Sequence, residues 1–96
     1  MKKYKSQKEF EADIKDGIFY SEESIDITDF SLQVECSIKV LGNIDARDIK
    51  ARDIEARDIS FYAVAFAYIS FACKSIIGRR QNSKFFCLDS EVKINK

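Results

Sequence analysis

The stretch from Ile44 to Ile59 repeats every five residues, and this period limits the folds open to the chain. Each unit holds an aliphatic residue, a variable polar residue, Ala, Arg and Asp, and the apolar positions continue in phase to Phe71. A helix repeats its apolar face about every 3.6 residues and a strand about every two, so neither keeps this pattern on one side. The repeat therefore predicts a β-solenoid, in which the chain turns a corner after each unit. The alternative is a charged surface helix followed by a separate apolar strand.

The later units pair an aliphatic residue with Phe two positions on: Ile59/Phe61, Val64/Phe66 and Ile69/Phe71. This pattern resembles the pentapeptide-repeat family, whose right-handed, four-sided β-helix takes four units per coil. In that family a small residue and, two positions later, a bulky apolar residue both point inward. The earlier units differ from this pattern because the larger residue, Ile, comes first and Ala comes second. The resemblance implies that residues twenty positions apart stack, which would place Ala46 beside Phe66 and Ala51 beside Phe71.

The segments on either side of the repeat have patterns of their own. Ser6 and Glu9 form a capping box, and with Gly17 at the C′ position they predict one helix of about ten residues. Strict apolar alternation from Phe30 to Val40 predicts strands, either as a lead-in sheet or as an irregular first coil. We therefore expect one mainly β domain, with a capping helix in 1–17, lead-in strands in 18–43, the solenoid in 44–77, and a basic loop with a closing strand or hairpin in 78–96.

The composition argues against an enzyme. The chain has no His, which removes the commonest general base and metal ligand, and it has no Gly-rich phosphate loop, nucleophile elbow or paired-carboxylate motif. Cys36, Cys73 and Cys87 lack zinc-finger spacing, so small core residues are favoured over a zinc site completed by Asp89. We expect no catalytic residue, no metal and no cofactor.

Three features predict the compartment. The number of cysteines is odd, the N-terminus carries lysines without an apolar core, and the longest apolar run is too short to span a bilayer. These features predict a soluble cytoplasmic protein, in the bacterial host if the gene belongs to a phage, and no membrane partner.

The net charge is zero, but the charges are divided along the chain. Between Glu9 and Glu35 nine acidic residues accompany one lysine, whereas the stretch from Lys74 to Lys84 holds four cations and no acid. Such asymmetry favours charged partners. The candidate acidic binding residues are Glu9, Asp13, Asp16, Glu22, Glu23, Asp26 and Asp29.

Basic and aromatic residues form a second candidate site. Arg47, Arg52 and Arg57 should lie at successive corners as an outer belt, either solvated or binding phosphates or carboxylates. Tyr62 and Tyr68 replace charged outer positions, so a covering helix, a second copy or a foreign partner could lie over them. The candidate basic and aromatic binding residues are Lys74, Arg79, Arg80, Lys84, Tyr62 and Tyr68.

Three functions of different classes fit these features. The first is a non-catalytic protein that binds and inhibits a nucleic-acid enzyme: the family that the chain resembles includes DNA mimics that occupy topoisomerase surfaces, and the chain also looks like a phage accessory protein such as an anti-CRISPR. The second is an assembly module that associates with itself, for instance as a homodimer, through its solenoid. The third is a protein that binds nucleic acid directly through the Arg79/Arg80 loop.

Overall fold

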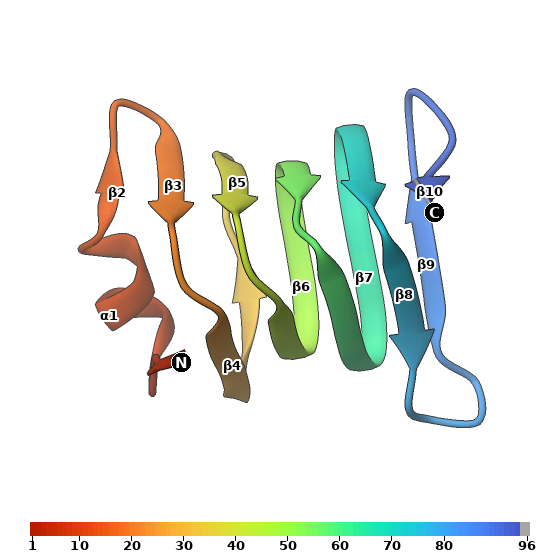
Figure 1. Cartoon of the computed structure of the whole chain (residues 1–96), viewed down its shortest axis with the longest axis horizontal. Coiled ribbons are helices and arrows are strands. Elements are labelled where there is room, and N and C mark those ends of the chain that lie inside the picture. The colour runs from red at the N-terminus through yellow and green to blue at the C-terminus, as the bar shows by residue number, and fades with distance from the viewer. Residues whose placement is uncertain (95–96) are drawn as a thin grey trace.

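The described part of the chain, residues 1–94 of the computed structural model, winds into a β-solenoid of about five turns (Figure 1). Among the described strands, neighbours run parallel except in the short hairpin of β2 and β3. The mainly β class and the solenoid that the repeat predicts are confirmed. The elements are β1 (Lys2–Lys3), α1 (Gln7–Glu11), β2 (Ile14–Lys15), β3 (Ile18–Ser21), β4 (Ile25–Gln33), β5 (Ser37–Val40), β6 (Ile44–Glu55), β7 (Asp58–Cys73), β8 (Ser75–Gly78), β9 (Lys84–Cys87) and β10 (Lys93–Ile94).

Each coil has three sides, so the expectation of four sides is wrong. Ile59 pairs with Ile44, fifteen positions earlier, after the chain has passed through three inward-facing pairs of β6. Ala46 consequently lies beside Phe61, and Ala51 lies beside Ala67. Face A holds residues 25–27, 44–46, 59–61 and 76–78, face B holds 31–33, 48–50, 64–67 and 84–87, and face C holds 18–21, 37–40, 53–55, 70–72 and 93–94. Corner 1 joins face A to face B, corner 2 joins B to C, and corner 3 joins C to the next A.

The spacing of the inward pairs changes from five residues in β6 to six in β7. The buried pairs along β6 and the residue that follows it are Ile44/Ala46, Ile49/Ala51 and Ile54/Ala56, and those of β7 are Ile59/Phe61, Ala65/Ala67 and Phe71/Cys73. The register shifts at two corners, where β7 has one residue more than β6. The expected inward pair Val64/Phe66 is therefore wrong, and so is the inward position of Ile69, which is exposed.

Packing inside the narrow tube explains the change of spacing. Ala65 lies beside Ile49, and Phe61 lies beside Ala46, so a large side chain meets a small one at these two positions. Pairing of large with small side chains helps to fill a narrow tube at normal protein density. A second large side chain at position 65 would have no room.

The segment before the repeat forms irregular first coils of the same tube. Ile25 pairs with Ile44 and Ile27 with Ala46, so β4 stacks directly on β6. The alternating residues expected to face inward are buried, apart from the half-buried Phe30: Leu32, Val34, Cys36, Ile38 and Val40. The sheet bends between β4 and β5, so the alternation continues around corner 2.

The aspartates of the repeat bond to neighbouring coils. Asp48 accepts hydrogen bonds from the Ser31 hydroxyl at 2.6 Å and from the Val64 N–H at 3.2 Å. Asp53 accepts from the hydroxyls of Ser37 at 2.7 Å and Ser70 at 2.9 Å. Asp58 accepts from the Ser75 hydroxyl at 2.7 Å. Within residues 1–94, the one ion pair between an Arg and an Asp of the repeat joins Arg52 Nε to Asp53 at 3.7 Å. Hydrogen bonds to carboxylates contribute about 1–3 kcal/mol each. The Asp therefore ties coils together, and the adjacent Arg is left for the surface.

The N-terminal helix is shorter than the sequence predicts. The Ser6 hydroxyl accepts a hydrogen bond from the Glu9 N–H at 3.2 Å, which confirms the N-cap. The helix ends at Glu11, however, and Gly17 belongs to the turn between β2 and β3 rather than to a helix terminus. Asp16 and Gly17 both have positive φ angles, 54° and 74°. Asp-Gly is a strong signal for a two-residue hairpin turn, and here it outweighs the helical pattern.

Aromatic side chains and one amide connect the N-terminal segment to the first coils. Phe10 of α1 is fully buried and stacks on Phe19 with ring centroids 4.0 Å apart, while Tyr4 meets both rings edge-on. The Gln7 amide donates to the Gln33 carbonyl at 3.0 Å and accepts from the Gln33 N–H at 3.1 Å. These are the two bonds that the backbone of a further strand would make.

A polar network lies beside this aromatic cluster. The Tyr4 hydroxyl donates to Asp13 at 2.6 Å, and Lys2 Nζ donates to the same carboxylate oxygen at 2.9 Å. The hydrogen bond from Tyr4, followed by that from Lys2, lowers the pKa of Asp13 below its usual value. Asp13 is thus a structural partner of the N-terminal strand.

The other end of the described chain forms a last coil rather than a hairpin. β8, β9 and β10 each pair in parallel with β7, on faces A, B and C respectively. Of the expected closing strand or hairpin, the hairpin is therefore wrong, and strands close the described coil. Phe85 and Ile94 occupy inward positions of this coil but are 40% and 42% exposed. Within residues 1–94, no helix has the length and apolar character needed to cross a membrane.

Candidate functional site

Corner 1 brings together Arg47, Tyr62 and Arg79 from three successive coils. Arg47 follows the inward pair of β6, Tyr62 follows that of β7, and Arg79 follows β8. The Arg79 N–H bonds to the Phe61 carbonyl at 2.8 Å, and its guanidinium reaches back across β7 to the Ala46 carbonyl at 2.7 Å. With Thr28, the three side chains line a shallow depression of about 530 Å³. The two arginines therefore share one depression with the exposed phenol ring of Tyr62.

The loop after β8 holds a second arginine at this corner. The Arg80 N–H bonds to the Tyr62 carbonyl at 3.1 Å, and the Ser83 N–H bonds back to the Arg80 carbonyl at 3.1 Å. Gly78 lies so close to Ser83 that a Cβ at this position would overlap its hydroxyl. Glycine is required here by close approach, and it lets the loop fold back over the corner.

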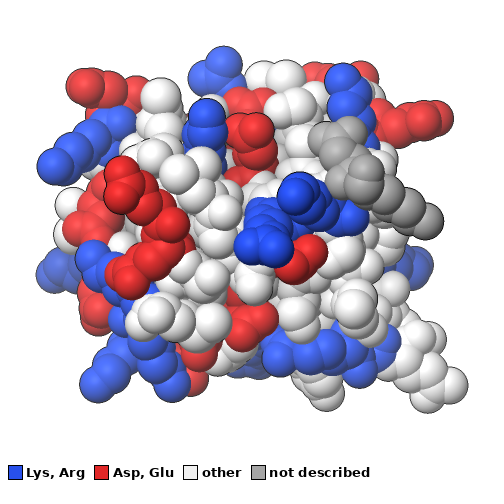
Figure 2. Space-filling view, viewed as in Figure 1, with Lys and Arg blue, Asp and Glu red and all other residues white. Residues whose placement is uncertain are grey.

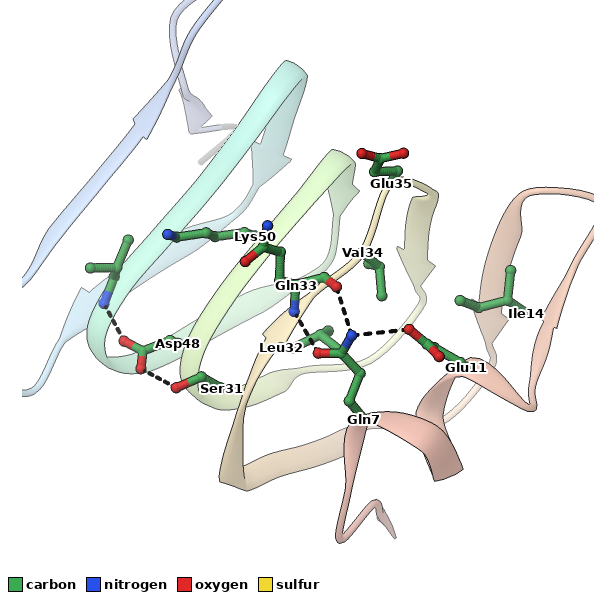
Figure 3. Close-up of a pocket in the computed structure, with 11 residues that line it drawn as sticks. Gln7, Glu11, Ile14, Ser31, Leu32, Gln33, Val34, Glu35, Asp48 and Lys50 are labelled. Atoms are coloured by element: carbon green, nitrogen blue, oxygen red, sulfur yellow. Dashed lines mark hydrogen bonds between the residues drawn. The ribbon is translucent and has the colours of Figure 1, made fainter.

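An aromatic row continues from corner 1 onto the outer surface of face B. Lys50, Phe66 and Phe86 are register neighbours on β6, β7 and β9, and all three point outward. The rings of Phe66 and Phe86 lie 4.5 Å apart, and Tyr68 meets Phe66 edge-on at 4.7 Å. Lys50 extends from β6 toward β7 along this surface (Figure 3). We define the basic–aromatic surface as Arg47, Lys50, Tyr62, Phe66, Arg79, Arg80, Lys84 and Phe86.

The five arginines and lysines of the basic–aromatic surface are not held in ion pairs with neighbouring carboxylates within residues 1–94. The nearby Asp48 accepts hydrogen bonds from Ser31 and Val64. In Figure 2, basic side chains form a row along the lower edge of the view, where the corner that leads out of β8 lies. This surface can attract anions.

The predicted acidic residues are spread around the N-terminal coils. In the view of Figure 2 acidic side chains gather over the N-terminal elements, with lysines and arginines among them. Three of these acids pair with cations of the N-terminal strand: Asp13 with Lys2 at 2.9 Å, Asp29 with Lys3 at 3.5 Å, and Glu23 with the N-terminal amine at 3.8 Å. Hydrogen bonds from Thr28 lower the pKa of Asp26. Glu9, Asp16 and Glu22 are exposed at three different places, on α1, in the β2–β3 turn and after β3.

The predicted basic and aromatic residues are spread over all three corners. Arg47, Arg52 and Arg57 lie at the three corners of one coil, as the repeat predicts. Lys74 lies at corner 3, where its N–H bonds to the Arg57 carbonyl at 2.6 Å. Tyr68 lies at corner 2, on the far side of face B from Tyr62, and both rings are exposed rather than covered by α1. The predicted basic and aromatic residues are thus not one site.

A groove of about 990 Å³ adjoins the basic–aromatic surface on the N-terminal half of face B (Figure 3). Gln7 bonds to both Glu11 and Gln33 across its floor, and Asp48 bonds to Ser31 (Figure 3). Its other charged residues, Glu35 and Lys50, extend outward. The groove thus holds three acids, Glu11, Glu35 and Asp48, together with Lys50.

The cysteines lie apart from one another. Cys36 and Cys73 are buried at opposite ends of face C, and burial raises the pKa of both thiols, which disfavours the thiolate. Cys87 is on face B, and its sulfur lies 3.3 Å from the Ser90 hydroxyl. Among residues 1–94, no three His, Cys, Asp or Glu side chains are grouped in a way that could hold a metal ion.

Comparison with protein-family models, curated proteins and solved structures found no match to this chain. The sequence interpretation missed Lys50, Phe66 and Phe86. One signal could have revealed Phe66: Ala65 and Ala67 repeat the small inward residue of the earlier units, and this pairing turns Phe66 outward.

Proposed function

We propose that this chain is a non-catalytic binding protein that holds an anionic macromolecule on the basic–aromatic surface. The observation that carries the proposal is that Arg47 and Arg79 line one depression with Tyr62 at corner 1. Guanidinium groups present several donors in a plane and bind phosphates and carboxylates well. Lys50, Arg80 and Lys84 extend the same positive surface over face B and the adjoining loop.

Binding to a labelled polyanion tests this proposal. We expect labelled heparin to raise its fluorescence anisotropy on binding, with an affinity that falls steeply between about 50 and 200 mM salt. The double variant Arg47→Ala/Arg79→Ala should weaken binding about tenfold, because two charge-assisted contacts are lost. The matched control is Arg52→Ala/Arg57→Ala, which removes the same charge from corners 2 and 3. Equal weakening by both double variants would show that no particular surface is used.

Inhibition of a nucleic-acid enzyme through the acidic segment stays a prediction. It has less geometric support, because those acids surround the N-terminal coils and three of them pair with nearby cations. An anti-CRISPR or topoisomerase-binding role would be consistent with the present proposal if the protein competes for the enzyme's nucleic acid. An enzyme assay with the Arg47→Ala/Arg79→Ala variant separates competition through corner 1 from mimicry by the acids.

Self-association is a second candidate function, supported by the last described coil. Phe85 and Ile94 point inward there yet stay partly exposed, and an uncovered sheet edge readily pairs with another chain. Two such coils would bring Arg79, Lys84 and Lys93 of each copy together. The like charges of the two copies repel each other, and added salt screens this repulsion. We therefore expect the dimer to become more stable as the salt concentration rises, whereas polyanion binding becomes weaker. Light scattering that shows a monomer at both low and high salt would exclude this candidate.

We also propose that α1 caps the N-terminal end of the tube. Phe10 covers the first coil from outside the stack, and the Gln7 amide satisfies the backbone of Gln33. An uncapped solenoid would expose core side chains and unpaired strand edges at this end. The right-handed sense of the coil stays a prediction.

A further inference from the structure

We infer that the anionic macromolecule is a single-stranded nucleic acid, whose bases stack on the aromatic row of face B while its phosphates contact the cations beside it. This inference rests on the proposed function and adds the class of partner. It is carried by the position of cations that form no ion pair in the described part of the chain next to exposed aromatic rings.

Phe86 is the most exposed ring of the aromatic row on face B. Its ring is 47% exposed and packs at 4.5 Å against Phe66, which in turn is supported edge-on by Tyr68. Each ring is therefore held in place by another ring while part of its surface remains open to solvent. A base can stack on such a ring whatever its sequence, because every base has a flat aromatic face.

The register of the strands places cations beside the aromatic row. Lys50, Phe66 and Phe86 form one outward row across three coils, and Lys84 lies in the neighbouring row beside Val64. Arg47, Tyr62 and Arg79 form the row at corner 1, which leads directly into face B. Coils are spaced by about 4.8 Å, so the surface offers room for roughly two to four nucleotides.

This combination favours a single strand over the other polyanions. The bases of a duplex are stacked on one another and offer no free face to Phe86, so a duplex would use the cations alone. An acidic protein segment would also use the cations without a need for flat rings. Of these partners, an unpaired strand is the one that offers phosphates and free base faces together.

Fluorescence anisotropy with a labelled twelve-nucleotide oligothymidine, a duplex of equal length, heparin and polyglutamate tests the inference. We expect the single strand to bind about tenfold more tightly than the duplex, with a slope of log K against log salt of about −3 if four phosphates are contacted. Phe86→Ala should weaken binding of the single strand about tenfold and leave heparin binding unchanged. The matched control is Tyr20→Ala, an aromatic residue on face C that is 51% exposed.

A second variant reports stacking directly. The chain contains no Trp, so Phe86→Trp places a single indole in the row, and a stacked base should quench its fluorescence. Tyr20→Trp should not be quenched. If heparin, duplex and single strand bind equally and the indole of the Phe86→Trp variant is not quenched, this inference fails while the proposed function stands. Tighter binding of polyglutamate than of the oligonucleotide would point instead to an acidic protein, and no binding of any anion would overturn both proposals.

Discussion

Replacing Ala65 with aspartate is expected to unfold the protein, whereas replacing its neighbour Phe66 with aspartate should leave the fold intact. Ala65 is fully buried beside Ile49, so the new carboxylate would be enclosed by apolar side chains. An unpaired charge in such a place costs several kcal/mol, which is most of the roughly 5–14 kcal/mol of stability expected for a chain of this length. Phe66 points outward, where an aspartate reaches water. Circular dichroism and thermal unfolding measure both variants.

The paired substitutions also test the six-residue spacing of β7. If the five-residue phase of β6 continued through β7, Phe66 would face inward and Ala65 outward, and the effects of the two variants would be exchanged. We expect Phe66→Asp to lose about 1–2 kcal/mol at most, because the contacts with Phe86 and Tyr68 are on the outside of the tube. A folded Ala65→Asp variant would contradict the register described above.

Replacing Phe10 with alanine should have the second-largest effect, a loss of about 3–5 kcal/mol in the free energy of unfolding. The Phe10 ring is fully buried and stacks on Phe19 at 4.0 Å, so its removal leaves a cavity at the end of the tube. Urea unfolding followed by circular dichroism measures the change.

Tyr20→Ala is the control for this effect, since Tyr20 is the next residue along β3 after Phe19 but points to solvent. It should change the stability by less than about 1 kcal/mol. Similar losses for both variants would mean that α1 contributes little to closing the tube.

The fold could be predicted from the sequence where one local signal acted alone. The buried Ile and Ala of β6 follow from the five-residue period, and Ser6 caps α1 as its capping box predicts. Each of these features depends on residues that are close in sequence. Gly17 was misinterpreted because two local signals competed there, and the Asp-Gly turn outweighed the end of a helix.

The number of sides per coil could not be obtained in the same way. It depends on which residues meet across coils, such as Ala46 with Phe61, and a period alone leaves this open. The outward position of Phe66 depends on such contacts as well, because the small Ala65 rather than Phe66 lies inside the tube beside Ile49. The candidate site depends on both features, because corner 1 unites Arg47, Tyr62 and Arg79 only in a three-sided coil with this register.

The extra residue at each corner of β7 has a consequence for how such a protein can change over time. The inward pairs keep their stacking whether one or two residues separate them from the next side. Lengthening or exchange at a bend therefore alters what the molecule displays without disturbing its interior. The residues that fill the tube and those displayed at its bends are different, so the surface at a bend can change while the tube is inherited unchanged.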